Sequence, residues 1–142
     1  MTATSTSRQS QSQSGTPALM WLLFLADAGL LIASGAIHFH LWEMPGGYRT
    51  VPTLRILFLV QGAACVLAAI ALLVTRHLLI VAGSALLMAG TIAGFILART
   101  VGIFGFKLPF STTEANIVLG VEIAAIVLLA ATALLLRRQR NS

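Results

Sequence analysis

The chain has 142 residues, of which 58% are apolar and only 9% are charged, and its mean hydropathy is +0.94, far above that of a water-soluble domain. Because a spanning helix takes about 20 apolar residues, this content fits four membrane spans and excludes a cytosolic enzyme, a nucleic-acid-binding domain and a secreted disulfide scaffold. The formal charge of +5 follows from basic residues flanking the spans, and the single cysteine, Cys65, excludes an internal disulfide.

The N-terminal third is predicted to hold a tail and the first span. Residues 1–16 are rich in Ser, Thr and Gln and cannot bury a core, which predicts a disordered tail. Residues 17–42 form the first span, with Asp27 as their only formally charged side chain. Small residues at 33–36 would suit cleavage of a signal peptide, but the acid inside the apolar run favours a retained span.

Three further spans are predicted over residues 54–75, 78–98 and 114–136. The short polar turn Arg76–His77 predicts that the third span returns antiparallel beside the second. Residues 137–142 then form a basic C-terminal tail. The predicted fold class is therefore all-α, a four-helix transmembrane bundle with antiparallel up-down topology.

Two helix starts carry capping signals. Thr53 is predicted as the N-cap of the second span. Ser111 to Glu114 matches the S-x-x-E capping box before the fourth span.

Four spans place both termini on one side of the membrane, and the basic residues indicate which side. Three arginines follow the fourth span directly, which predicts cytoplasmic termini. The full sets are Arg8, Arg76, Arg137, Arg138 and Arg140 on that side, against Arg49, Arg55, Arg99 and Lys107 on the other. The two connectors predicted to face outward carry aromatic residues that suit the headgroup level: Trp42, Tyr48, Phe104, Phe106 and Phe110.

A line of glycines in the third span predicts a helix-packing face. Gly83, Gly90 and Gly94 lie within about 20° of one direction on a helix. Small residues let helices approach closely in lipid, where no hydrophobic effect drives association. The partner of this face is either a neighbouring span or a second copy of the chain.

Polar residues of the first span also share a face. Asp27, Ser34 and His38 lie within roughly 20° of one another at 100° per residue. An ionised carboxylate in mid-span costs on the order of 2.5 to 3.5 kcal/mol. Asp27 is therefore predicted to be protonated, paired or facing a wet interior, and either a proton path or simple helix packing would explain the face.

The outer end of the first span carries a candidate metal site. His38, His40 and Glu43 form an H-x-H-x-x-E pattern, and Glu122 of the fourth span could add an oxygen ligand. Imidazole and carboxylate ligands suit zinc, copper or iron, and haem is a further candidate cofactor. The alternative is that both histidines anchor a helix end at the interface.

Several further polar residues point inward or terminate helices. Gln61 and Glu122 each lie about two turns inside their spans, so together with His38 they could form a polar cluster in the outer half of the bundle. Arg99 is a candidate partner for Glu122 or Glu114. His77 is interpreted as a turn residue, and Cys65 as a small buried apolar side chain.

Several segments give the chain a resemblance to a known group. The segments are HFHLW (38–42), GYRTVPT (47–53), LFLVQ (57–61) and VGIFGF (101–106), together with Glu122. On these residues the chain resembles a group of small four-helix bacterial integral membrane proteins of unassigned activity. The resemblance covers most of residues 20–135, implies four spans, and implies no reaction.

Three functional hypotheses follow. The first is a non-enzymatic accessory or assembly subunit that docks a larger membrane complex or forms a homo-oligomer. The second is an outward-facing metal or haem site on His38 and His40, serving redox chemistry or metal handling. The third is proton-coupled transport of a small solute, with Asp27 and Glu122 as the proton-binding carboxylates. All three place a multi-pass protein in the cell membrane, in contact with the lipid bilayer and without a nucleic-acid partner.

Overall fold

Four long helices make up the protein. The computed structural model describes residues 15–44, 50–108 and 113–141, and these contain α1 (Gly15–Glu43), α2 (Pro52–Thr75), α3 (Leu78–Thr100) and α4 (Thr113–Asn141). All four are long and apolar enough to cross a membrane. The prediction of an all-α bundle of four membrane-spanning helices is confirmed.

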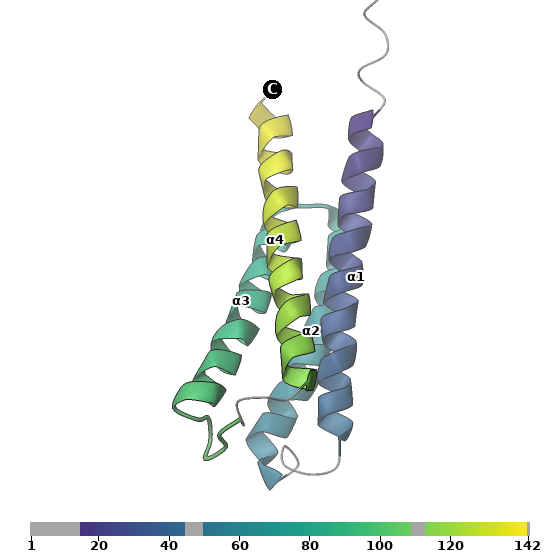
Figure 1. The fold of residues 1–142 in the computed structure, drawn as a ribbon. Coiled ribbons are helices and arrows are strands. Elements are labelled where there is room, and N and C mark those ends of the chain that lie inside the picture. The colour runs from purple at the N-terminus through teal and green to yellow at the C-terminus, as the bar shows by residue number, and fades with distance from the viewer. Residues whose placement is uncertain (1–14, 45–49, 109–112, 142) are drawn as a thin grey trace, which may run out of the picture.

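The helices form a ring in which each contacts two others. α1 packs against α2 and α4, and α3 packs against α4 and, least extensively, α2. In Figure 1 the first turn of α1 and the C-terminal end of α4 lie at the top, whereas the C-terminal ends of α1 and α3, from which the connectors leave, lie at the bottom. The two ends of the bundle are called here the terminal end and the connector end.

All four helices extend past their predicted bounds by at least one residue, and three of these differences bear on a specific prediction. α2 begins at Pro52, with Val51 as an extended N-cap that makes no side-chain hydrogen bond. Thr53 as the N-cap is therefore wrong, because proline fits the first helical position, where its missing N–H is not needed. α4 continues to Asn141, so most of the predicted basic tail is helical. Gly15 and Thr16, assigned to the tail, already belong to α1.

Some predictions lie outside the described residues. These are the disorder of residues 1–14, the capping box that begins at Ser111, and the interfacial placement of Tyr48 and Phe110. α4 is described from Thr113 onward, with Glu114 in its first turn.

The turn between α2 and α3 is as short as the sequence indicates. Arg76 adopts a left-handed conformation (φ 49°, ψ 36°) and its N–H donates to the carbonyl of Leu72, which is a common way to end a helix. His77 is the N-cap of α3, and its Nδ1 accepts a hydrogen bond from the Leu79 N–H at 3.3 Å. The Arg76 guanidinium also lies 3.5 Å from the centre of the Trp21 ring, which ties the turn to α1.

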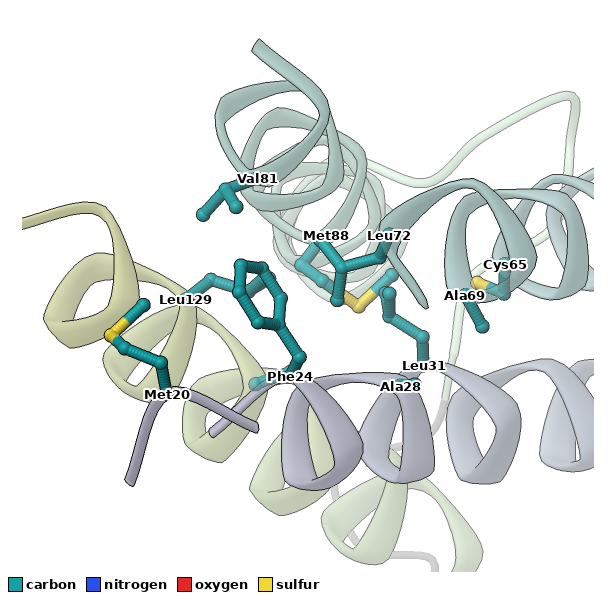
Figure 2. Close-up of a cluster of buried hydrophobic side chains, with 11 residues drawn as sticks. Met20, Phe24, Ala28, Leu31, Cys65, Ala69, Leu72, Val81, Met88 and Leu129 are labelled. Carbon is teal, nitrogen blue, oxygen red and sulfur yellow. The ribbon is translucent and has the colours of Figure 1, made fainter. Parts of the chain in front are cut away.

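A hydrophobic core fills the half of the bundle near the terminal end. Figure 2 shows side chains of all four helices meeting there, including Phe24 and Leu31 of α1, Leu72 of α2, Met88 of α3 and Leu129 of α4. Each of these five side chains is at most 2% exposed. Cys65 is also fully buried in this cluster, as its interpretation as a small apolar residue predicted.

Glycines of α1 and α2 bring the backbones of these two helices close together. A Cβ added at Gly35 would lie 3.2 Å from both the Cys65 Cβ and the Gly62 carbonyl oxygen, and a Cβ at Gly62 would lie 3.2 Å from the Gly35 carbonyl oxygen. The two backbones can approach here because neither glycine carries a side chain. This contact accounts for the extensive packing of α1 against α2.

Candidate functional site

The connector half of the bundle encloses a cavity of about 410 Å³. All four helices and the segment after α3 contribute to its wall, and the wall is apolar except at His38, Gln61, Thr91 and Glu122. No lysine or arginine is among its lining residues in the described part of the chain. The volume lies within the usual range for small-molecule sites, about 300 to 1,000 Å³.

The segment after α3 folds over the connector end of this cavity. Phe104 (φ 51°) and Gly105 (φ 79°) form a tight two-residue turn, and the backbones of Ile103 and Phe106 exchange two hydrogen bonds of 2.8 Å across it. Positive φ at both central positions matches the hairpin turn that favours glycine second. Ile103, Phe106 and Leu108 line the cavity, so the VGIFGF segment acts as its floor.

The cavity opens sideways, between α2 and α3. Leu57 of α2 is 45% exposed and Leu86 of α3 is 73% exposed, although both line the cavity. Figure 1 shows the connector half of α3 leaning away from the rest of the bundle. In a membrane these exposed leucines would face hydrocarbon, so this side of the cavity would be open to lipid.

Two glycines of α3 give this side of the cavity its width. Gly90 and Gly94 line the cavity, and a Cβ added at either meets no heavy atom within 4 Å. Gly83 is equally open but does not line the cavity. The three glycines therefore make no close helix contact within the described chain, and packing of this face on a second copy stays a prediction. The glycine contact that the bundle does use, between Gly35 and Gly62, was missed because those residues lie in different spans.

Glu122 is the central polar group of the cavity. Its side chain is fully buried, and neither carboxylate oxygen has a hydrogen-bond partner among the described residues. Its nearest polar neighbour is His38, whose Nε2 lies 3.9 Å from Oε1. That separation is too long for a hydrogen bond, and a buried unsatisfied carboxylate in a native fold calls for a functional explanation.

His38 is oriented by its own helix. Nδ1 lies 2.8 Å from the Ser34 carbonyl oxygen, to which it donates. The neutral ring then keeps Nε2 as a hydrogen-bond acceptor, and this atom faces Glu122. The ring also lies 5.9 Å from the Phe58 ring of α2, which adds an apolar contact on the cavity side.

A short polar chain crosses the bundle beside this pair. Gln61 Nε2 donates to Thr91 Oγ1 of α3 at 2.5 Å and lies 3.7 Å from Cys65 Sγ, which is itself 3.9 Å from Ser34 Oγ. The chain links α1, α2 and α3 at the inner end of the cavity. The structure thus brings Gln61, His38 and Glu122 to one cavity, as their predicted positions in the outer half of the bundle suggested.

Asp27 belongs to a different environment. It is fully buried, and Thr132 Oγ1 of α4 donates to its Oδ2 at 2.7 Å, while Oδ1 has no hydrogen-bond partner in the described ranges. Asp27, Ser34 and His38 do share the buried face of α1. Asp27 does not line the cavity, however, so the two carboxylates that were candidates for proton binding occupy separate sites.

The four residues of the candidate metal site are not gathered by the fold. His38 and Glu122 face each other, whereas His40 and Glu43 are exposed on α1, because neighbouring helical positions point in different directions. Within the described residues, no group of three or more His, Cys, Asp or Glu side chains could hold a metal ion.

Arg99 also differs from its predicted role. Its Nη2 donates to Asn116 Oδ1 at 3.4 Å and its guanidinium lies 4.7 Å from the Phe95 ring centre. Among the described residues it forms no ion pair with Glu122 or Glu114 within 4.0 Å. In the described part of the chain, the imidazole of His38 is the only basic side chain within 4.0 Å of the Glu122 carboxylate.

Comparisons with protein families, with curated proteins and with solved structures find no match to this chain. The resemblance to small four-helix bacterial membrane proteins stays a prediction. The case for function therefore stands on the cavity and its polar groups.

Proposed function

We propose that this small multi-pass membrane protein binds a lipid-soluble small molecule in the cavity between α2 and α3. The observation that carries the proposal is the coexistence of an apolar cavity of about 410 Å³ with a fully buried carboxylate, Glu122, that has no hydrogen-bond partner among the described residues. Apolar walls with a few convergent polar groups are the usual composition of a ligand site.

The direction of access supports a ligand that resides in the bilayer. Cavity-lining leucines on α2 and α3 are exposed where the helices diverge, and Ile103, Phe106 and Leu108 line the connector end of the cavity. An apolar molecule with one polar head could enter from lipid, place its body against the leucines and bring its head to His38 and Glu122. The role is binding, either to sequester the molecule or to present it to a partner protein, as an accessory subunit would.

The placement in the cell is part of the proposal. The cluster Arg137, Arg138 and Arg140 at the end of α4 supports cytoplasmic termini. The connector end, and with it the cavity, would then lie in the outer half of the cell membrane.

Photoaffinity labelling tests the proposal. The protein is placed in nanodiscs of neutral phosphatidylcholine and exposed to dodecanol or dodecylamine carrying a diazirine in the chain, and the labelled residues are mapped by mass spectrometry. Labelling is expected on α2 and α3 residues that line the cavity. Gly94→Leu should fill the cavity and reduce that labelling at least fivefold, whereas Gly83→Leu, on the same helix and equally open, should leave it unchanged.

Two outcomes would contradict ligand binding in this cavity. In the first, neither probe labels the lining residues. In the second, both probes label all lipid-facing helices and Gly94→Leu has no effect on the labelling.

A further inference from the structure

We propose that the cavity selects molecules whose polar head is a positively charged primary amine. This inference rests on the proposed function and specifies its ligand class. It follows from the hydrogen-bonding capacity of the polar groups that face the cavity and from the charge around them.

The groups at the head of the cavity are acceptors. Both oxygens of Glu122 lack a hydrogen-bond donor among the described residues. The Nδ1 hydrogen of His38 is used by the Ser34 carbonyl, which leaves Nε2 of the neutral ring as a third acceptor. Three acceptors with no donor match the three N–H groups of a primary ammonium, whereas a hydroxyl head offers a single donor.

The distances suit one ammonium nitrogen. Nε2 of His38 and Oε1 of Glu122 are 3.9 Å apart, so a single nitrogen can lie within a hydrogen-bond length of about 2.8 to 3.0 Å of both atoms. No protein group bridges this gap in the described chain. The space between the two atoms suits a single donor nitrogen of a ligand.

The charge balance of the cavity also favours a cation. Glu122 is the only Asp or Glu that lines the cavity, and no Lys or Arg of the described residues lines it. An ionised carboxylate in such a site is unfavourable until a positive charge neutralises it. An ammonium head supplies that charge, a hydroxyl head does not, and a fatty-acid carboxylate would add a repelling one.

A proton competes with the amine for the carboxylate of Glu122. Glu122 accepts either a proton or the ammonium head, so acidification should weaken amine binding by linkage. Among the titratable groups, His38 of α1 lies 3.9 Å from Glu122 and Cys65 of α2 interacts with it electrostatically, and the described lining residues of α3 contribute none. Protonation of His38 would act in the same direction, because it turns Nε2 into a donor.

Competition among matched ligands tests the inference. Dodecylamine, dodecanol and dodecanoic acid, which differ only in their heads, compete against the photoactivatable dodecanol in the same neutral nanodiscs. In the wild type we expect the amine to compete at a concentration at least about tenfold lower than the alcohol, with the acid weakest. In Glu122→Gln the amine and the alcohol should become equal, while the labelling pattern stays on the cavity.

The outcomes separate the head group from the cavity. Two results overturn the amine assignment and leave the proposed function standing, provided that labelling remains on the cavity. In the first, the amine and the alcohol compete equally in the wild type. In the second, the amine preference is unchanged by Glu122→Gln. Loss of cavity labelling by both probes overturns the proposed function itself. Should Glu122→Gln fail to fold, the wild type still decides, because its amine preference must shrink on acidification from pH 8 to pH 5 while competition by the alcohol stays constant.

Discussion

The two halves of the bundle are built on opposite principles. Near the terminal end, side chains from four helices interlock around Leu31, Leu72, Met88 and Leu129, each at most 2% exposed. Near the connector end, the same helices surround about 410 Å³ of unfilled space and leave Glu122 without a hydrogen-bond donor among the described residues. Both halves bury a carboxylate oxygen without a hydrogen-bond partner among the described residues, Asp27 Oδ1 in the packed half and the two oxygens of Glu122 in the hollow half. The halves therefore differ in how completely side chains fill them.

The largest expected effect is the loss of stability on truncating a leucine of the packed half, compared with a leucine of the hollow half. Leu72→Ala should destabilise the bundle by about 2 kcal/mol or more, because it opens a void that neighbouring helices cannot fill. Leu57→Ala, at the exposed edge of the cavity, should change stability by less than about 0.5 kcal/mol. Reversible unfolding in mixed detergent micelles, followed by circular dichroism, measures both, and equal losses would contradict the division into halves.

A smaller loss is expected at the glycine contact of α1 and α2. Gly35→Ala should destabilise by about 1 to 3 kcal/mol, because its Cβ would meet the Gly62 carbonyl oxygen and the Cys65 Cβ at 3.2 Å. Gly29→Ala is the matched control on the same helix, since a Cβ there meets nothing within 4 Å. The same unfolding assay applies, and a control as damaging as Gly35→Ala would show that the loss does not come from this contact.

The smallest effect should be a gain. Glu122→Met replaces a buried carboxylate that has no hydrogen-bond donor among the described residues by an apolar side chain of similar size, and it should raise stability by about 1 kcal/mol. Thermal unfolding in detergent checks the sign, with Glu114→Met on the exposed first turn of α4 as the control. A clear loss of stability would mean that Glu122 stabilises the fold, and the comparison between the halves would weaken.

The parts of the molecule that sequence reasoning captured are those fixed by local periodicity. The length of apolar runs predicted four spans, and 100° per residue placed Asp27, Ser34 and His38 on one buried face of α1. The turn at Arg76 and His77 followed from two polar residues between apolar runs.

The parts that were missed depend on how separate helices approach each other. Spacing within α3 indicated a glycine face but could not show that Gly90 and Gly94 border a cavity instead of a helix. The hydrogen bond from Thr132 to Asp27 joins residues 105 positions apart, and no pattern along one helix predicts such a pair. His40 does not lie beside His38 at Glu122, because α1 stays helical to Glu43 and residues two positions apart on a helix point in different directions.

The two-residue connection between α2 and α3 restrains the N-terminal end of α3, so a change in the tilt of α3 moves its far end most. Arg76 in this turn contacts Trp21 of α1, which holds the start of α3 in place. Gly90 lies about 18 Å along the helix from the start of α3 at 1.5 Å per residue. A swing of about 5° would therefore shift this wall of the cavity by roughly 1.5 Å. Bilayer thickness biases helix tilt, so cavity labelling should differ between nanodiscs of short-chain and long-chain lipids. The thickness of the surrounding membrane would then control the width of the cavity.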